Sequence, residues 1–277
     1  MNNLSQAITF EISSRLQGSI SPRLQQKIAY IHIPKCGGVS LSKAIKACYV
    51  NWNVRDESLY KLDSEAAQRA METVENQPLT THDSRVVSFR QNLLLYGMAQ
   101  PQVKYISGHF LFSNVAYDAF KDQYAFVTML RDPVKRWISA YFYNRYKDYG
   151  NSKIELDIDT YLESDIARRS GQTYARYLCG LTDYQGDYSS DEIIQKAQEN
   201  LTKFTVVGCI ERKDLFETEF SKAFGQPLKL GKWNKSPKNK DYQKSLITDD
   251  MMDKIRQLCK SDIEIYNYAM RHLIERH

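Results

Sequence analysis

The stretch Ile31-His-Ile-Pro-Lys-Cys-Gly-Gly-Val-Ser-Leu41 decides the fold of this chain. An apolar run over residues 28–33 predicts a strand, a lysine and two glycines follow it, and Ser40 opens a segment with the pattern of a helix. A strand that passes through a glycine loop into a helix presents backbone N–H groups and a helix N-terminus to an anion. The stretch therefore predicts an anion-binding loop in an α/β fold. It differs from the nucleotide-hydrolase loop G-x-x-x-x-G-K-[ST], because Lys35 precedes the glycines.

A second junction of the same kind lies further along the chain. Residues 123–130 (QYAFVTML) have the composition of a buried strand and run directly into Arg131-Asp-Pro-Val-Lys-Arg-Trp-Ile-Ser139. Pro133 suits the first turn of a helix, which places Arg131 at the strand end and Ser139 two turns into the helix. Both motifs thus lie where a strand gives way to a helix.

Together the two motifs resemble those of the sulfotransferases that use 3′-phosphoadenosine 5′-phosphosulfate (PAPS). The most similar branch is the carbohydrate O-sulfotransferases, which include the heparan sulfate 2-O and 6-O enzymes. The resemblance extends over residues 28–240. It implies a P-loop-like three-layer α/β domain with a central parallel sheet flanked by helices. It also implies in-line transfer of the sulfuryl group from PAPS to an acceptor hydroxyl.

In that family I-P-K-x-G-G-x-S takes the 5′-phosphosulfate, and R-D-P-x-x-R-x-x-S-x-Y takes the 3′-phosphate through its Arg and Ser. The lysine-rich stretch 231–240 resembles the C-terminal cofactor loop, although its match is looser. The resemblance implies these cofactor-binding residues: Lys35, Cys36, Gly37, Gly38, Val39, Ser40, Leu41, Arg131, Ser139, Lys235, Ser236 and Lys238. Lys35 is also expected to act in catalysis by contacting the bridging oxygen. No metal is expected, because fixed cations and N–H donors suffice for the low charge of the transferred group.

Cys36 and Val39 stand where the family often has Thr, so backbone contacts are expected there in place of hydroxyl contacts. A cysteine beside a lysine at a helix N-terminus can also have a lowered pKa and react as a thiolate. A small loop residue is the simpler interpretation of Cys36.

Among the five histidines, His109 is the expected catalytic base. It follows a predicted strand in Ser107-Gly-His, and in the glycosaminoglycan O-sulfotransferases a histidine in a similar segment acts as base. His32 is expected to be structural, and His82 to be exposed. A carboxylate base, as in the tyrosylprotein sulfotransferases, is the alternative, but the sequence offers no distinguished Glu for it.

The acceptor is expected to be a saccharide on the resemblance alone. Arginines and tyrosines in or beside two long polar segments are candidates to bind it: Arg85, Arg90, Arg145, Arg168, Arg169, Arg176, Tyr141, Tyr143, Tyr174 and Tyr177. Surface charge and helix packing explain the same residues nearly as well. The alternatives are a lipid, small-molecule or tyrosine hydroxyl, or a non-catalytic relative that binds nucleotide or glycan. A nucleotide kinase conflicts with the place of Lys35, and no nucleic-acid recognition motif is present.

Four short apolar runs, residues 27–33, 103–107, 124–130 and 204–210, predict the strands of one domain over residues 1–277. A polar extension covers residues 1–26, and insertions are expected at about 51–100 and 146–200. The net charge of +5 suits an anionic cofactor, and five cysteines without C-x-x-C spacing indicate neither a disulfide framework nor a zinc site.

No apolar segment approaches the ~20 residues of a membrane span. The Golgi members of the family carry a transmembrane anchor, so we expect a cytoplasmic, bacterial-type enzyme, unless the chain is a form trimmed of its anchor.

Overall fold

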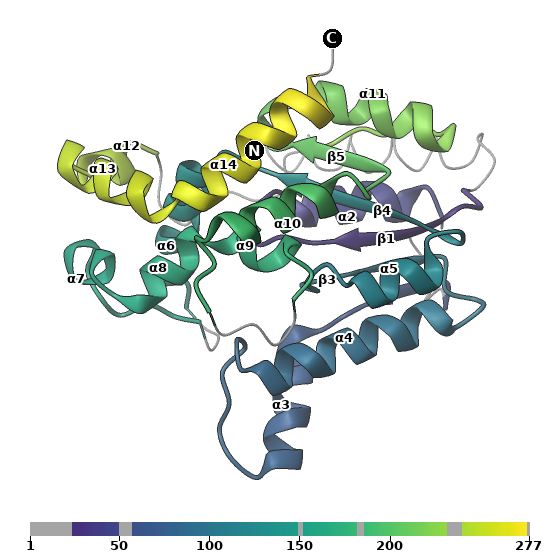
Figure 1. The fold of residues 1–277 in the computed structure, drawn as a ribbon, viewed down its shortest axis with the longest axis horizontal. Helices are drawn as coiled ribbons and strands as arrows, with labels where there is room; N and C mark the ends of the chain where they lie inside the picture. The colour runs from purple at the N-terminus through teal and green to yellow at the C-terminus, as the bar shows by residue number, and fades with distance from the viewer. Residues whose placement is uncertain (1–23, 50–56, 149–151, 182–185, 232–239, 276–277) are drawn as a thin grey trace, which may run out of the picture.

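A parallel sheet of five strands forms the centre of the computed structural model, which describes residues 24–49, 57–148, 152–181, 186–231 and 240–275 (Figure 1). The strands are β1 (Lys27–Ile31), β2 (Leu59–Lys61), β3 (Tyr105–Gly108), β4 (Tyr124–Leu130) and β5 (Val206–Cys209). Their order across the sheet is β2-β3-β1-β4-β5, and every neighbouring pair is parallel. All strands except β2 are buried along almost their whole length, as expected of parallel strands covered on both faces.

Helices cover the sheet on both sides, which confirms the predicted α/β class. Figure 1 shows α9, α10 and α14 in front of the sheet and α2 behind it. The helices are α2 (Gly38–Ala47), α3 (Ser64–Glu75), α4 (Ser84–Ala99), α5 (Asn114–Phe120), α6 (Pro133–Tyr146), α7 (Ile158–Leu162), α8 (Asp165–Gly171), α9 (Thr173–Leu178), α10 (Asp191–Leu201), η1 (Ile210–Arg212), α11 (Lys213–Phe224), α12 (Lys240–Ser245), α13 (Asp249–Leu258), α14 (Lys260–Ala269) and η2 (Met270–Ile274).

The four predicted strands are all present, and β4 has the predicted bounds. The other three begin or end one or two residues away from the predicted limits. The edge strand β2 was not predicted. It spans only Leu59–Lys61, is partly exposed, and is too short to show the alternation that identifies a strand. It pairs with β3, so part of the expected insertion at 51–100 belongs to the sheet.

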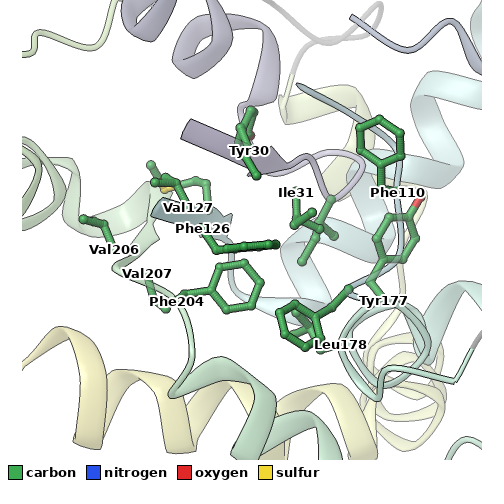
Figure 2. Packing of buried hydrophobic residues seen from close by; sticks show 14 of the residues in the cluster. Tyr30, Ile31, Phe110, Phe126, Val127, Tyr177, Leu178, Phe204, Val206 and Val207 are labelled. Atoms are coloured by element: carbon green, nitrogen blue, oxygen red, sulfur yellow. The ribbon is translucent and has the colours of Figure 1, made fainter. Parts of the chain in front are cut away.

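Two hydrophobic clusters hold the strands and helices together. The larger one surrounds the sheet, and Figure 2 shows Ile31, Phe126 and Phe204 within it. The smaller one gathers Trp137 with residues of α7, α8 and α13, and the Trp137 Nε1–H donates to the Ala167 carbonyl over 3.0 Å. The larger cluster fixes the ends of β1 and β4, and the smaller one fixes the helix that follows β4.

Candidate active site

Three predicted site residues lie just beyond the carboxyl ends of three adjacent strands. Ile31, the last residue of β1, pairs with Gly108 of β3 and with Thr128 of β4. His109 follows Gly108 directly, and Lys35 and Arg131 come shortly after β1 and β4. Loops at the carboxyl ends of parallel strands share one edge of a sheet, which is where α/β proteins bind ligands. The strand register therefore places Lys35, His109 and Arg131 at a common edge.

The loop between β1 and α2 is tightly constrained. Lys35 and Gly37 have φ angles of 67° and 74°, in the left-handed region that favours glycine. A Cβ atom added at Gly37 would come within 2.8 Å of Ile210 Cδ1. A Cβ atom added at Gly38 would lie 1.6 Å from His32 Nε2. Both positions thus require glycine, one for conformation and space and the other for space alone.

The start of α2 offers backbone N–H groups to a ligand. Gly37 is the N-cap of α2, no side chain caps the helix, and its first turn contains no acidic residue. The first N–H groups of a helix have no acceptor within it, and here they belong to Gly37, Gly38, Val39 and Ser40. The N–H of Leu41 already donates to the Gly37 carbonyl over 3.2 Å, and the Leu41 side chain is buried. An anion at this end would complement the free N–H groups and the helix dipole.

The second motif meets the first through Arg131. Its Nη1–H donates to the Lys35 carbonyl over 3.2 Å. Directly after it, Asp132 caps α6 by accepting the Lys135 N–H over 2.8 Å, and Pro133 opens the helix as predicted. Ser139 lies on α6, is half-buried, and its hydroxyl has no hydrogen-bond partner among the described residues. The two motifs, distant in sequence, therefore form one site.

The hydroxyl of Tyr174 holds Arg131 in place. It accepts the Arg131 backbone N–H over 2.9 Å and donates to the Arg131 carbonyl over 2.5 Å. It also lies 3.5 Å from Cys36 Sγ. Tyr174 is fully buried, so it presents no aromatic face to an acceptor. The sequence singled out Tyr174 as a candidate to bind the acceptor, whereas in the structure its hydroxyl contacts Arg131 of one motif and Cys36 of the other.

A buried carboxylate from the C-terminal part of the chain positions Tyr174. Asp262 Oδ1 accepts the backbone N–H groups of Tyr174 and Ala175 over 2.8 and 3.1 Å. Burial raises the pKa of Asp262 to about 6, against the opposing effect of the nearby Arg136 guanidinium. Arg136 is itself buried, and its Nη2–H donates to the Ser170 carbonyl. Sequence analysis missed Asp262, although an acidic residue on the buried stripe of α14, with Ile265 and Ala269, is a detectable signal.

The Lys35 ammonium lies over an aromatic ring. Its Nζ is 3.5 Å from the centroid of the Tyr143 ring, and Tyr143 is 40 % exposed. Burial, together with the cations of Arg131 and Lys147, lowers the pKa of Lys35 to about 8. Lys35 thus keeps its charge near neutral pH in a partly dry, electropositive site, where a cation interacts strongly with an anion.

The surroundings of Cys36 disfavour a thiolate. The side chain is fully buried, and burial raises its pKa to about 11 even though Tyr174 and two arginines act in the opposite direction. The simpler interpretation, a small packed loop residue, agrees with this environment.

His109 makes a hydrogen bond that fixes its tautomer. Its Nδ1 lies 2.7 Å from the His32 carbonyl oxygen. Because a carbonyl only accepts, Nδ1 carries the proton in the neutral ring, and Nε2 keeps a free lone pair. Burial lowers the pKa of His109, partly offset by this hydrogen bond, and Arg90 and Lys61 lower it further. The His32 ring packs against His109, with 4.4 Å between the ring centroids.

Other predicted contacts are absent or lie outside the described residues. Tyr141 and Tyr177 are buried and therefore present no face to a sugar. Lys235, Ser236 and Lys238 lie in 232–239, which the structure does not describe.

No group of three metal-ligating side chains occurs among the described residues. All five cysteines are free thiols. Within the described ranges, no helix combines the length and apolar character needed to cross a membrane.

Comparisons with known proteins agree with this geometry. A comparison with curated proteins finds no match. A family model described as the sulfotransferase family matches residues 22–269, which include both motifs, His109 and Tyr174. This chain therefore belongs to the sulfotransferase family, whose members move a sulfuryl group to an acceptor.

Proposed function

We propose that this protein is an O-sulfotransferase that moves the sulfuryl group of PAPS to a saccharide hydroxyl, with His109 as general base. The observation that carries the proposal is the strand register. Ile31 pairs with both Gly108 and Thr128, so the loops bearing Lys35, His109 and Arg131 share one edge of the sheet. A cation, a neutral base and a phosphate-binding arginine are the groups that sulfuryl transfer needs.

The residues present fit the phosphates of PAPS. Gly37 and Gly38 let the Ile210 and His32 side chains pack directly against the loop backbone, which fixes the loop in place. The free N–H groups at the start of α2 would hold the 5′-phosphosulfate, with Lys35 beside its bridging oxygen. Arg131 and Ser139 would bind the 3′-phosphate, and Lys235, Ser236 and Lys238 would add to the nucleotide site. PAPS, when bound, supplies the sulfuryl group.

The chain's own groups account for the charge and proton steps. Lys35 stabilises negative charge that develops on the leaving oxygen, which is how fixed cations accelerate group transfer. His109 is mostly neutral near pH 7 because its pKa is lowered, and its free Nε2 can accept the proton of the acceptor hydroxyl. The His32 carbonyl holds the ring by its other nitrogen.

The saccharide acceptor rests on the resemblance of both motifs and of the Gly108-His109 segment to the carbohydrate O-sulfotransferases, including the heparan sulfate enzymes. A panel with labelled PAPS and saccharides, lipids, phenols and tyrosine peptides tests it. Transfer to saccharides alone is the expected result. Transfer only to another class would contradict the saccharide assignment.

The cofactor assignment has its own test. Adenosine 3′,5′-bisphosphate should raise the melting temperature far more than AMP at the same concentration. A ligand at a hundred times its dissociation constant adds ~2.7 kcal/mol to the free energy of unfolding, which a thermal scan resolves. Arg131→Ala should remove the advantage of the bisphosphate over AMP. Equal shifts for both nucleotides in the wild type would contradict the assignment.

A further inference from the structure

The tyrosine that faces Lys35 differs from the other tyrosines considered for the acceptor. Tyr143 lies on α6 and is 40 % exposed, whereas Tyr141, Tyr174 and Tyr177 are buried. It is part of neither hydrophobic cluster, and among the described residues its ring contacts no other aromatic ring. Core packing therefore does not explain the position of this ring, whereas its contact with the Lys35 ammonium does.

The ring is also the partner of the Lys35 ammonium. The 3.5 Å between Nζ and the ring centroid lies well within the reach of a cation–π interaction. In the described parts of the chain, no carboxylate forms an ion pair with Lys35. The Lys35 backbone is fixed by its φ of 67° and by the Arg131 hydrogen bond to its carbonyl. The side chain can therefore change its partner while the backbone stays in place.

Tyr143 reaches Lys35 from the helix that also carries Ser139. The two residues lie one turn apart on α6, so they share a face of that helix. Ser139 is proposed to bind the 3′-phosphate, which places Tyr143 at the border of the proposed nucleotide site. Lys35 is half-buried and Tyr143 exposed, so an anion from solvent can reach the ammonium without displacing a core side chain.

The ring acts on the charge of Lys35 without neutralising it. The negative face of an aromatic ring attracts a cation and so favours the charged form. Burial and the cations of Arg131 and Lys147 lower the pKa of Lys35 to about 8, while Cys36 acts in the opposite direction, as the ring does. The attraction to a ring is weaker than a charge-assisted hydrogen bond to an anionic oxygen. An oxygen of the donor can therefore take the ammonium from the ring.

We propose that Tyr143 is a positioning residue, whose ring holds the Lys35 ammonium in the free enzyme and yields it to the bridging oxygen of the bound donor. This inference rests on the proposed transferase function and adds to it a residue that acts through Lys35. A carboxylate in the place of the ring would neutralise the ammonium and compete with the donor. An aromatic ring leaves the full positive charge for the leaving oxygen.

Titration of Lys35 tests the contact on the full chain with ¹³C-labelled lysine, observed by NMR and assigned with Lys35→Arg. In the free protein, Tyr143→Leu should lower the titration midpoint of Lys35 by ~0.5–1 pH unit, because the ring no longer favours the cation. Tyr143→Phe keeps the ring and should titrate as wild type. Tyr96→Leu, the same change at an exposed tyrosine of α4, is the control. An unchanged midpoint in Tyr143→Leu, or an equal fall in Tyr143→Phe, would overturn the proposal.

Saturation with adenosine 3′,5′-bisphosphate tests the exchange, because its 5′-phosphate offers oxygens to the ammonium in place of the ring. The difference in the Lys35 midpoint between wild type and Tyr143→Leu should then disappear. With labelled PAPS, Tyr143→Leu should lower the alkaline limb of kcat/KM, which reports the free enzyme, and leave that of kcat, which reports the complex. A difference that persists with the bisphosphate, or two limbs that move together, would overturn the proposal.

Fluorinated phenylalanines at position 143 separate the charge distribution of the ring from its size. Each added fluorine weakens the negative face of the ring, so the Lys35 midpoint in the free protein should fall stepwise. A midpoint that does not depend on the number of fluorine atoms would overturn the proposal. Failure of the wild type to bind the bisphosphate would count against the proposed function instead, since the titration of the free protein does not depend on it.

Discussion

Around Lys35 and Arg131, the polar groups of the site are held by other groups of the protein: the Lys35 carbonyl accepts from Arg131, and both backbone groups of Arg131 bond to Tyr174. Around His109, the ring is held by one hydrogen bond, between its Nδ1 and the His32 carbonyl, and its Nε2 has no hydrogen-bond partner among the described residues. The loops that carry Lys35 and Arg131 are thus fixed by contacts within the protein, whereas His109 keeps one ring nitrogen for a group from outside. The proposed nucleotide contacts are preorganised, and the proposed base keeps the atom that an acceptor hydroxyl needs.

His109→Gln gives the largest expected effect, because it removes the proposed general base. Loss of a general base lowers turnover by ~10²–10⁴-fold. The bisphosphate should still raise the melting temperature of the variant as in wild type. Steady-state rates with labelled PAPS measure the change, and His272→Gln, at an exposed position, is the control. Turnover near the wild-type value would remove His109 from the mechanism.

Substitution of Lys35 removes a positive charge from the proposed nucleotide site. Lys35→Met should lower turnover by ~10²–10³-fold, the usual cost of losing one transition-state charge contact. The pKa of Lys35 is lowered to about 8, so its cation is lost as the pH rises through that value, and kcat/KM for PAPS should fall there. The acid limb should lie below the ordinary histidine value of ~6.5, because the pKa of His109 is lowered and the neutral ring is the active form.

Lys35→Arg provides the control for this pH dependence. Arginine stays charged over the whole range, so the fall near pH 8 should disappear while some activity remains. If the alkaline limb persists unchanged in this variant, another group is responsible for it.

Gly38→Ala measures how rigid the loop between β1 and α2 is. The new Cβ atom would lie 1.6 Å from His32 Nε2, so the loop or the His32 ring must move. Overpacking of this kind costs ~1–3 kcal/mol in the free energy of unfolding, measured by denaturant titration. Gly225→Ala is the comparison: it has a φ of 64° but no atom within 4 Å, so only backbone strain contributes. A smaller loss for Gly38→Ala than for Gly225→Ala would show that the loop yields readily.

Tyr174→Phe has the smallest expected effect and acts through Arg131. The substitution removes a hydroxyl that satisfies both backbone groups of Arg131, so the arginine should be less well placed for the 3′-phosphate. We expect ~10-fold weaker binding of the bisphosphate, with AMP binding unchanged. Tyr124→Phe also removes a buried hydroxyl, which donates to the Val103 carbonyl far from the loop, and should leave both affinities as they are. Equal losses for both nucleotides would assign Tyr174 to general stability.

The sequence predicted four of the five strands and the loop that follows β1. It did not predict the side chains that connect the two motifs. Lys35 and Arg131 could be identified because local patterns, a glycine pair and an N-terminal proline, mark strand-to-helix junctions. Tyr174 was misassigned because α9 is buried on nearly all sides, which leaves no amphipathic pattern to separate a packed tyrosine from an exposed one. Which groups the buried Asp262 contacts depends on α9 and α14 packing together in space, which no local signal encodes.

The position of Asp262 in the sequence determines when its contacts can form during synthesis of the chain. The carboxylate that holds the start of α9, and through Tyr174 the backbone of Arg131, comes from α14, long after both motifs have been synthesised. A growing chain on the ribosome can form β1, β4 and their loops early, since domains fold as their segments emerge. The contact that holds the start of α9 nevertheless forms only after α14 has emerged, so Arg131 reaches its final position later than the strand that precedes it.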